Sequence, residues 1–258
     1  MVLLFITSGC ASHKQFFQDQ LEQELVLEET PYFPQQTYQC GPAALAMLLG
    51  ASGVVTDPEA LAPQTYLPGR KGSLQLELVA ACRQNYRIPY ILNPDFSSLV
   101  GELLEGRPVL VLQNLGLNIL PAYHYAVVIG LLPPNDIVLR SGEKNRLVMN
   151  IEDFLVSWER SHSWGMVALR PGEMPFYPDP TRYLRAVNGF ELSTNHFLAT
   201  EAYLAARAAW PENQTALFAL GNNYLYLAEY HEAEKVFREL LTSNPSHVAA
   251  SNNLAEAL

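Results

Sequence analysis

The chain has 258 residues, of which 49% are hydrophobic and 16% are charged, and its formal net charge is -10. A chain of this length and apolar content can bury a sizeable core, which excludes a largely disordered protein and allows one large domain or a medium domain with a smaller one. The acidic balance, without any run rich in Lys or Arg, argues against a surface for nucleic acid. No stretch approaches the ~20 apolar residues of a transmembrane helix.

The N-terminus reads MVLLFITSGCASHKQ, a short apolar run followed by small residues and Cys10. This resembles the lipobox of bacterial lipoproteins, in which a small-residue site ending in Gly precedes a cysteine that is lipidated. A signal peptide usually has a basic start and about 7–15 apolar residues, and a translation start further upstream would supply both. The resemblance implies a signal peptide over 1–9 and a lipid anchor at Cys10. No Asp follows, which favours an outer-membrane lipoprotein facing the periplasm; a chance match is the alternative.

Residues 10–30 are polar and acidic and predict a tether or a weak helix. The segments after them alternate between apolar periodic runs and Pro- or Gly-rich breaks, which separate helices and strands. We expect helices over 40–50, 74–86 and 96–106, strands over 88–92 and 107–116, and a loop with a short helical piece over 57–73.

Two apolar runs flank the turn signal PPND between residues 123 and 142, which predicts a β-hairpin. A helix around Phe154 to Trp158 and a last strand over 164–169 follow. Because helices come first and an antiparallel sheet afterwards, residues 31–172 are predicted to form an α+β domain. Residues 173–194 begin Pro-rich and without periodicity, and we interpret them as a linker.

The segment 195–258 is alanine-rich and helical in pattern, and residues 214–247 match the 34-residue period of tetratricopeptide repeats. Small residues at motif positions would let paired helices touch, while aromatic ones fill the space between units. An array of this kind presents a surface for a protein partner, or else it only braces the first domain. An ordinary helical hairpin is the plainer alternative. The matching positions are Leu217, Leu220, Gly221, Tyr224, Ala233, Phe237 and Pro245, preceded by Ala199, Tyr203, Ala206 and Pro211.

Three scattered cysteines, Cys10, Cys40 and Cys82, are too few for a disulfide framework or a zinc site, and nothing in the sequence suggests a metal or an organic cofactor. Cys82 lies on an amphipathic helical pattern and is interpreted as a small buried residue. Cys40 opens the helix CGPAALAMLLG, where free N–H groups and the helix dipole favour the thiolate. Pro42 stands where a missing N–H costs nothing.

A cysteine nucleophile needs a base from another element. Of the six histidines, His124 lies at the start of the apolar strand in AYHYAVVIG. A polar, titratable side chain is unusual in such a strand and suggests a specific role. The default interpretation of His124 is a structural role. The presence of Cys40 at the start of a helix, which would need a base, favours a catalytic role instead. The others have solvated, packing or loop positions by default: His13, His162, His196, His231 and His247.

The stretch PQQTYQCGPAALAMLL, followed by HYAVVIG 84 residues after the cysteine, resembles the C39 family of papain-like cysteine peptidases. The resemblance covers the predicted α+β domain. It implies that Cys40 attacks the substrate carbonyl and that His124 acts as general base and acid. It also implies that Gln35 donates to the oxyanion, beside the Cys40 backbone N–H; Gln36 and Gln39 remain competitors. One such side-chain donor contributes roughly 2.7–4 kcal/mol to transition-state stabilisation.

The family usually carries Asp followed by Pro on the strand after the hairpin, and this chain has Arg140 and Ser141 there. Asp136 is no substitute, because it lies beside the hairpin tip, ~30 Å from His124 at the rise of an extended strand. Arg140 has no acceptor lone pair. We therefore expect a Cys–His dyad whose imidazole is oriented by Ser141 or by a backbone carbonyl.

Three functions stay open at this point. The first is a cysteine peptidase that hydrolyses a peptide bond through a thioester on Cys40 and is anchored through Cys10. The second is a non-catalytic peptide-binding or assembly lipoprotein with a degenerate peptidase fold. The third is an acyl or peptidyl transferase that uses the same two residues.

Overall fold

The computed structural model describes residues 23–34, 40–70, 72–193 and 196–258. The chain forms two compact units, the first made of the described residues up to 74 with residues 91–167, the second of residues 75–90 with residues 168–258. The predictions for Cys10, Gln35, Gln36 and Gln39 fall outside the described residues.

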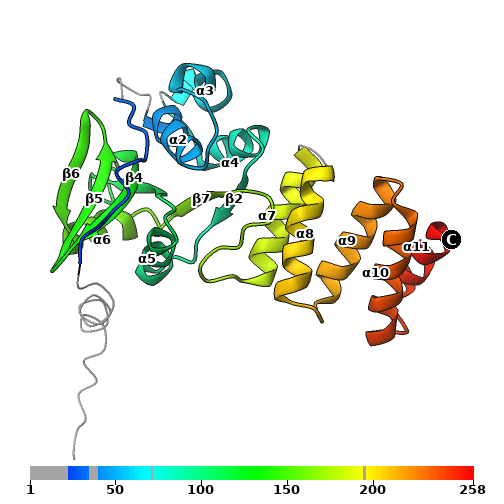
Figure 1. Cartoon of the computed structure of the whole chain (residues 1–258). Helices are drawn as coiled ribbons and strands as arrows, with labels where there is room; N and C mark the ends of the chain where they lie inside the picture. Colours follow the sequence, from blue (N-terminus) through cyan, green and yellow to red (C-terminus); the bar gives the residue numbers. More distant parts are fainter. Residues whose placement is uncertain (1–22, 35–39, 71, 194–195) are drawn as a thin grey trace, which may run out of the picture. The chain divides into compact units, whose positions relative to one another are not determined.

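Within the described residues, seven strands form one sheet in the order β2-β7-β3-β4-β5-β6, and β1 pairs additionally with β4. The pairs β1–β4, β3–β4, β3–β7, β4–β5 and β5–β6 are all antiparallel, as the sequence predicts. Figure 1 shows β4, β5 and β6 as adjoining green arrows. The strands are β1 Leu25–Val26, β2 Ile88–Ile91, β3 Val109–Asn114, β4 Tyr123–Leu132, β5 Asp136–Ser141, β6 Lys144–Asn150 and β7 Gly165–Leu169.

The central helix of the first unit is α2, Cys40–Ala51, which begins at the cysteine as predicted. Residues 41–49 are all buried, because α2 is apolar around its whole circumference and packs against β4 and β3. The other helices of this unit are α3 Pro58–Thr65, the 3₁₀ turn Pro68–Arg70, α5 Phe96–Leu104 and α6 Ile151–Glu159. Asp57 caps α3 by accepting a hydrogen bond from the N–H of Ala60.

Two strands differ from the sequence-based expectation. The predicted tether over residues 10–30 contains β1, which is fixed to the sheet by its pairing with β4. β6 was not predicted, because it is a largely exposed edge strand whose polar residues give no clear alternation of apolar side chains.

The second unit contains α4 Gln75–Gln84 and a series of five helices in which each packs against the next. Figure 1 shows this series as a row from α7 to α11. Its members are α7 Pro180–Ser193, α8 His196–Ala209, α9 Gln214–Tyr226, α10 Tyr230–Ser243 and α11 Val248–Ala257.

The prediction of a linker over 173–194 was wrong from residue 180 onward, where α7 begins. The local signals for this helix are present in the sequence. Asp179 accepts a hydrogen bond from the N–H of Arg182, and Pro180 occupies the first helical position. Tyr183, Val187 and Phe190 then recur at helical spacing and are fully buried.

The repeat positions of the second unit pack as their sizes suggest. A Cβ added at Gly221 would lie 2.5 Å from Cε1 of Phe237, so the α9–α10 contact requires glycine there. Leu217, Leu220 and Ala233 are buried, and Tyr224 is half-buried. These contacts describe a helical array; its assignment as tetratricopeptide repeats stays a prediction. No helix of the described chain combines the length and apolarity needed to span a membrane.

Candidate active site

Cys40 is the first residue of α2 and its side chain is half-buried. Burial raises the pKa of the Cys40 thiol above its ordinary value. Backbone hydrogen bonds with Tyr125, Gly41 and Cys40 itself act in the opposite direction, because they stabilise the thiolate. The backbone N–H groups therefore act in the predicted sense, but burial has the larger effect on the thiol pKa.

His124 is the second residue of β4 and is half-buried. The Cys40 sulfur hydrogen-bonds to the backbone of Tyr125, the residue that follows His124 on this strand, so the packing of α2 on β4 places the predicted nucleophile at the strand position next to the predicted base. Burial lowers the pKa of the His124 imidazole below its ordinary value. Burial thus disfavours the charged form of each of the two groups.

Ser141, the last residue of β5, places its hydroxyl oxygen 2.9 Å from Nε2 of His124. Of the two possibilities left open by the sequence, the structure thus brings Ser141 to the imidazole. A serine hydroxyl can either donate or accept, so it does not select one tautomer of the ring. A carboxylate can only accept, and would select the tautomer protonated at Nε2.

The other polar residues of β5 lie away from the imidazole. Asp136 pairs with Leu132, at the far end of β4 from His124, as expected from the hairpin geometry. Arg140 is buried, and its Nη2 donates to the backbone carbonyl of Glu28 at 2.8 Å. Neither side chain takes the place of the missing carboxylate.

Sequence reasoning missed two residues of β3 that hold the strand end carrying His124. Gln113 lies opposite His124 and donates from Nε2 to the hydroxyl of Ser157 on α6 at 2.7 Å. Asn114 accepts from the backbone N–H groups of Gly116 and Ala122, which closes the loop before β4. An Asn followed shortly by Gly after a strand is a recognisable turn signal.

An open cavity of about 540 Å³ lies beside this loop, on the side of Tyr123. Its lining is mostly polar and includes His162, which the sequence places in a loop. The lining residues are Asn114, Asn118, Tyr123, Val156, Glu159, Arg160 and His162.

Cys82 and two further histidines, His196 and His247, have structural surroundings. Cys82 is fully buried, and burial raises the pKa of its thiol to about 12, which confirms the interpretation as a core residue. His196 contacts Glu191 and Asn223 through Nδ1, and the Nδ1 of His247 accepts from the N–H of Ala250 to cap α11. His13 lies outside the described residues. In the described part of the chain, no three His, Cys, Asp or Glu side chains are grouped to hold a metal ion.

The model of the family described as "Peptidase_C39 like family" matches residues 27–165. The chain belongs to the Peptidase_C39 like family. The matched range contains Cys40, His124 and Ser141, and it begins directly after β1.

Two solved structures are similar to the family domain. One is a double-glycine-motif protease from an AMS/PCAT transporter in complex with the leader peptide, at 19% identity and a TM-score of 0.41, covering 54% of this chain and 89% of that chain. The other is the peptidase domain of Streptococcus ComA, a bifunctional ABC transporter involved in quorum sensing, at 21% identity and a TM-score of 0.46, covering 55% and 98%. No curated protein matches the chain.

Proposed function

We propose that this chain is a cysteine peptidase that cleaves a peptide bond through a thioester on Cys40, with His124 as general base and then general acid. The observation that supports it most is the hydrogen bond of the Cys40 sulfur with the backbone of Tyr125, the residue that follows His124 in the sequence, within a domain of a peptidase family. A cysteine and a histidine on packed elements, with a hydroxyl that contacts the histidine, are the kinds of group that acyl transfer needs, which supports the proposal.

The reaction would begin with the Cys40 thiol and the His124 imidazole both uncharged. Because Nε2 of His124 contacts Ser141, Nδ1 is the nitrogen left to accept the thiol proton as sulfur attacks the carbonyl carbon. The carbon–nitrogen bond then breaks, and the amine leaves with the proton from His124. Water, deprotonated by the same imidazole, attacks the thioester, releases the carboxylic acid and restores the thiol.

The oxyanion formed during attack needs donors near the sulfur. The backbone N–H of Cys40 is one, and Gln35 is the side chain that we propose for the second, with Gln36 and Gln39 as alternatives. Replacing the correct glutamine by alanine should cost about 10²–10³ in the acylation rate. The two incorrect ones serve as matched controls on the same segment.

The loop before His124 favours a polypeptide as the substrate. It is closed by mutual backbone hydrogen bonds between Leu117 and Leu120, yet its large apolar side chains point into solvent. Exposed apolar groups on an ordered loop are typical of a surface that contacts another chain. The exposed residues are Leu115, Leu117, Ile119, Leu120 and Tyr123.

The chemistry can be tested without knowing the substrate. The purified chain is mixed with p-nitrophenyl acetate, and the acetyl thioester is located by peptide mass spectrometry. We expect the ester at Cys40, and a loss of about 10²–10⁴ in the acetylation rate in His124→Ala, the range of general-base catalysis. Cys82→Ala should acetylate at the normal rate. An unmodified Cys40, or equal rates with and without His124, would overturn the peptidase proposal.

The second candidate is a peptide-binding lipoprotein without catalytic activity. The burial that raises the pKa of the Cys40 thiol, and the hydroxyl in place of a carboxylate, favour it. It predicts that a captured peptide is released intact, whereas the peptidase predicts a new carboxyl end. A transferase would instead pass the acetyl group of the thioester to an added amine such as glycinamide faster than to water.

For the whole protein we propose a lipid anchor at Cys10 that holds it at the outer membrane, facing the periplasm. Cys10→Ser should move the protein from the membrane fraction to the soluble fraction, and retention would contradict the anchor. We also propose that the array α8 to α11 contacts a protein partner. Crosslinks that map to residues 196–257 in the full chain would support this, and an array without crosslinks would contradict it.

A further inference from the structure

Residues 24–32 lie along the sheet and are tied to β4 at its far end from His124. Leu25 pairs with Leu131 and Val26 with Gly130, and the N–H of Leu27 donates to the carbonyl of Ile129 at 2.8 Å. A Cβ at Gly130 would overlap the carbonyl oxygen of Leu25, so this close approach requires glycine.

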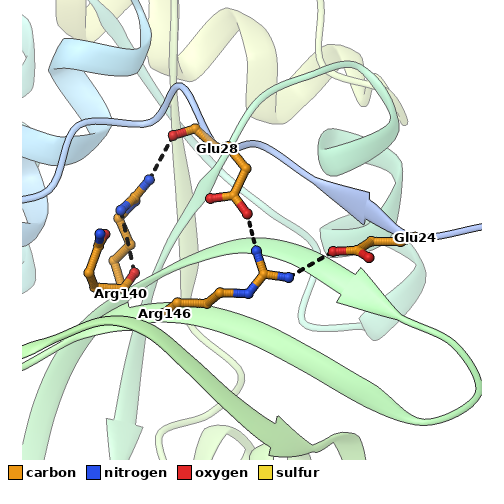
Figure 2. Close-up of polar contacts among 5 residues, drawn as sticks. Glu24, Glu28, Arg140 and Arg146 are labelled. Atoms are coloured by element: carbon orange, nitrogen blue, oxygen red, sulfur yellow. Dashed lines mark hydrogen bonds and ion pairs between the residues drawn. The ribbon is translucent and has the colours of Figure 1, made fainter.

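The same segment is held by two arginines of β5 and β6, as Figure 2 shows. Arg146 forms ion pairs with the carboxylates of Glu24 and Glu28, and all three side chains are exposed. Arg140 reaches the segment from a buried position and donates to the Glu28 carbonyl, while its Nη1 contacts the carbonyl of Asn145 at 3.4 Å. The buried hydrogen bond from Arg140 binds a backbone carbonyl and therefore fixes the position of the main chain of the segment. The exposed ion pairs of Arg146 are weak by comparison.

The segment ends beside the residue that contacts the imidazole. The Tyr32 hydroxyl donates to the carbonyl of Gly142 at 3.2 Å, and the Arg140 guanidinium lies 6.0 Å from the centre of the Tyr32 ring. Arg140 precedes Ser141 and Gly142 follows it, and Gly142 has a φ of 59° that favours glycine. Ser141 is therefore held on both sides by contacts to residues 24–32.

We propose that residues 24–32, named here the clamp, fix the position of Ser141 against His124, with Arg140 and Tyr32 as positioning residues. This proposal rests on the proposed function. A neutral hydroxyl–imidazole hydrogen bond is weak, so its occupancy depends on how firmly the backbone holds the hydroxyl. The contacts of Arg140 and Tyr32 hold that backbone from a segment more than 100 residues away in the sequence.

The first test compares Tyr32→Phe with Arg146→Gln in the acetylation assay. Tyr32→Phe keeps the ring under Arg140 and removes only the bond to Gly142. We expect a rate reduction of about twofold to tenfold and no larger than that of Ser141→Ala, because the effect passes through the single neutral hydrogen bond between Ser141 and His124. Arg146→Gln removes the exposed ion pairs of the clamp and should leave the rate within about twofold, since such pairs are weak. Equal rates in both variants would contradict the clamp.

A double-mutant cycle separates positioning from general stability. If Tyr32 acts through Ser141, Tyr32→Phe should have no further effect in a Ser141→Ala background. Additive effects would overturn the proposal. The ¹⁵N chemical shift of the His124 Nε2 supplies a second measurement, because it responds to the hydrogen bond with Ser141 and should change in Tyr32→Phe and in Arg140→Lys but not in Arg146→Gln.

The outcomes distinguish the two proposals. If Cys40 is acetylated at the same rate in the unmodified chain and in His124→Ala, the proposed function fails. If the acetylation rate depends on His124 but is unaffected by Tyr32→Phe and Arg140→Lys, only the clamp fails. Thermal unfolding of each variant identifies a rate loss that is caused by misfolding, and Tyr32→Phe alone decides the case if Arg140→Lys does not fold.

Discussion

Ser141 contacts the imidazole of His124 through its hydroxyl, 2.9 Å from Nε2, although the two residues are 17 positions apart and lie on different strands. The resemblance to the peptidase family predicts a carboxylate in this region. A hydroxyl holds the ring in place but does not select its tautomer, which makes this contact the most informative place to change the chain.

Replacing Ser141 tests how much the contact contributes. Ser141→Ala should slow Cys40 acetylation by about twofold to tenfold, because one neutral hydrogen bond is lost. Ser141→Asp should instead accelerate it, since a carboxylate accepts from Nε2 and leaves Nδ1 free to take the thiol proton. Ser193→Ala, an exposed serine of α7, is the control. A Ser141→Asp chain that acetylates more slowly than Ser141→Ala would contradict this role.

The pH dependence follows from the two shifted groups. Burial lowers the pKa of His124, so the neutral base persists below pH 6.5 and the acetylation rate should fall only at lower pH. Burial raises the pKa of Cys40 above 9.0, so a second increase, independent of His124, should appear only in alkaline solution. Stopped-flow rates for the unmodified chain and for His124→Ala, taken across the pH range, measure both the fall at low pH and the increase in alkaline solution. A plateau that begins above pH 6.5 is the result that this model does not allow.

The two described cysteines should differ strongly in accessibility. Cys40 is half-buried, whereas Cys82 is fully buried with a thiol pKa of about 12. Iodoacetamide at neutral pH should alkylate Cys40 slowly and leave Cys82 unmodified until the chain is unfolded. Mass spectrometry of the native and the guanidinium-unfolded chain checks this. Alkylation of native Cys82 at the rate of Cys40 would show that the second unit opens readily.

The contact between Gly221 and Phe237 predicts a large effect from one methyl group. In Gly221→Ala the new Cβ meets Cε1 of Phe237, and overpacking should lower the free energy of unfolding by about 1–3 kcal/mol. Adding Phe237→Leu should recover part of the loss. Gly69→Ala, where a Cβ meets open space, is the control. Circular dichroism during thermal unfolding measures all three, and an unchanged midpoint in Gly221→Ala would contradict the packing.

Gly130→Ala tests whether β1 is fixed to the sheet. The added Cβ overlaps the backbone of Leu25, which cannot move aside as a flexible side chain would. We expect β1 to detach and limited proteolysis to cleave residues 23–30 at least tenfold faster, a loss of ~1.4 kcal/mol of local protection. The control is again Gly69→Ala, and unchanged cleavage kinetics would show that β1 tolerates the methyl group.

Local signals in the sequence were sufficient to predict that α2 starts at Cys40 and that a hairpin carries His124. They were also sufficient to exclude Asp136 as the residue that orients His124. Each of these depends on neighbours in the chain: a helix-entry proline, an alternating apolar strand and a turn of known length. The same kind of signal was present for α7, whose Asp-Pro start and periodic apolar residues we interpreted as a linker because prolines were frequent before it.

The sequence by itself therefore determined which residues are the nucleophile and the base to be tested. The tertiary structure alone decided how the surroundings of Cys40 shift its pKa, because the burial that raises the thiol pKa arises when α2 packs against β4. It alone also placed Tyr32 on Gly142 and Arg140 on Glu28, across 110 and 112 residues. Local patterns specify helices and strands, whereas desolvation and contacts between distant residues exist only after the chain has folded.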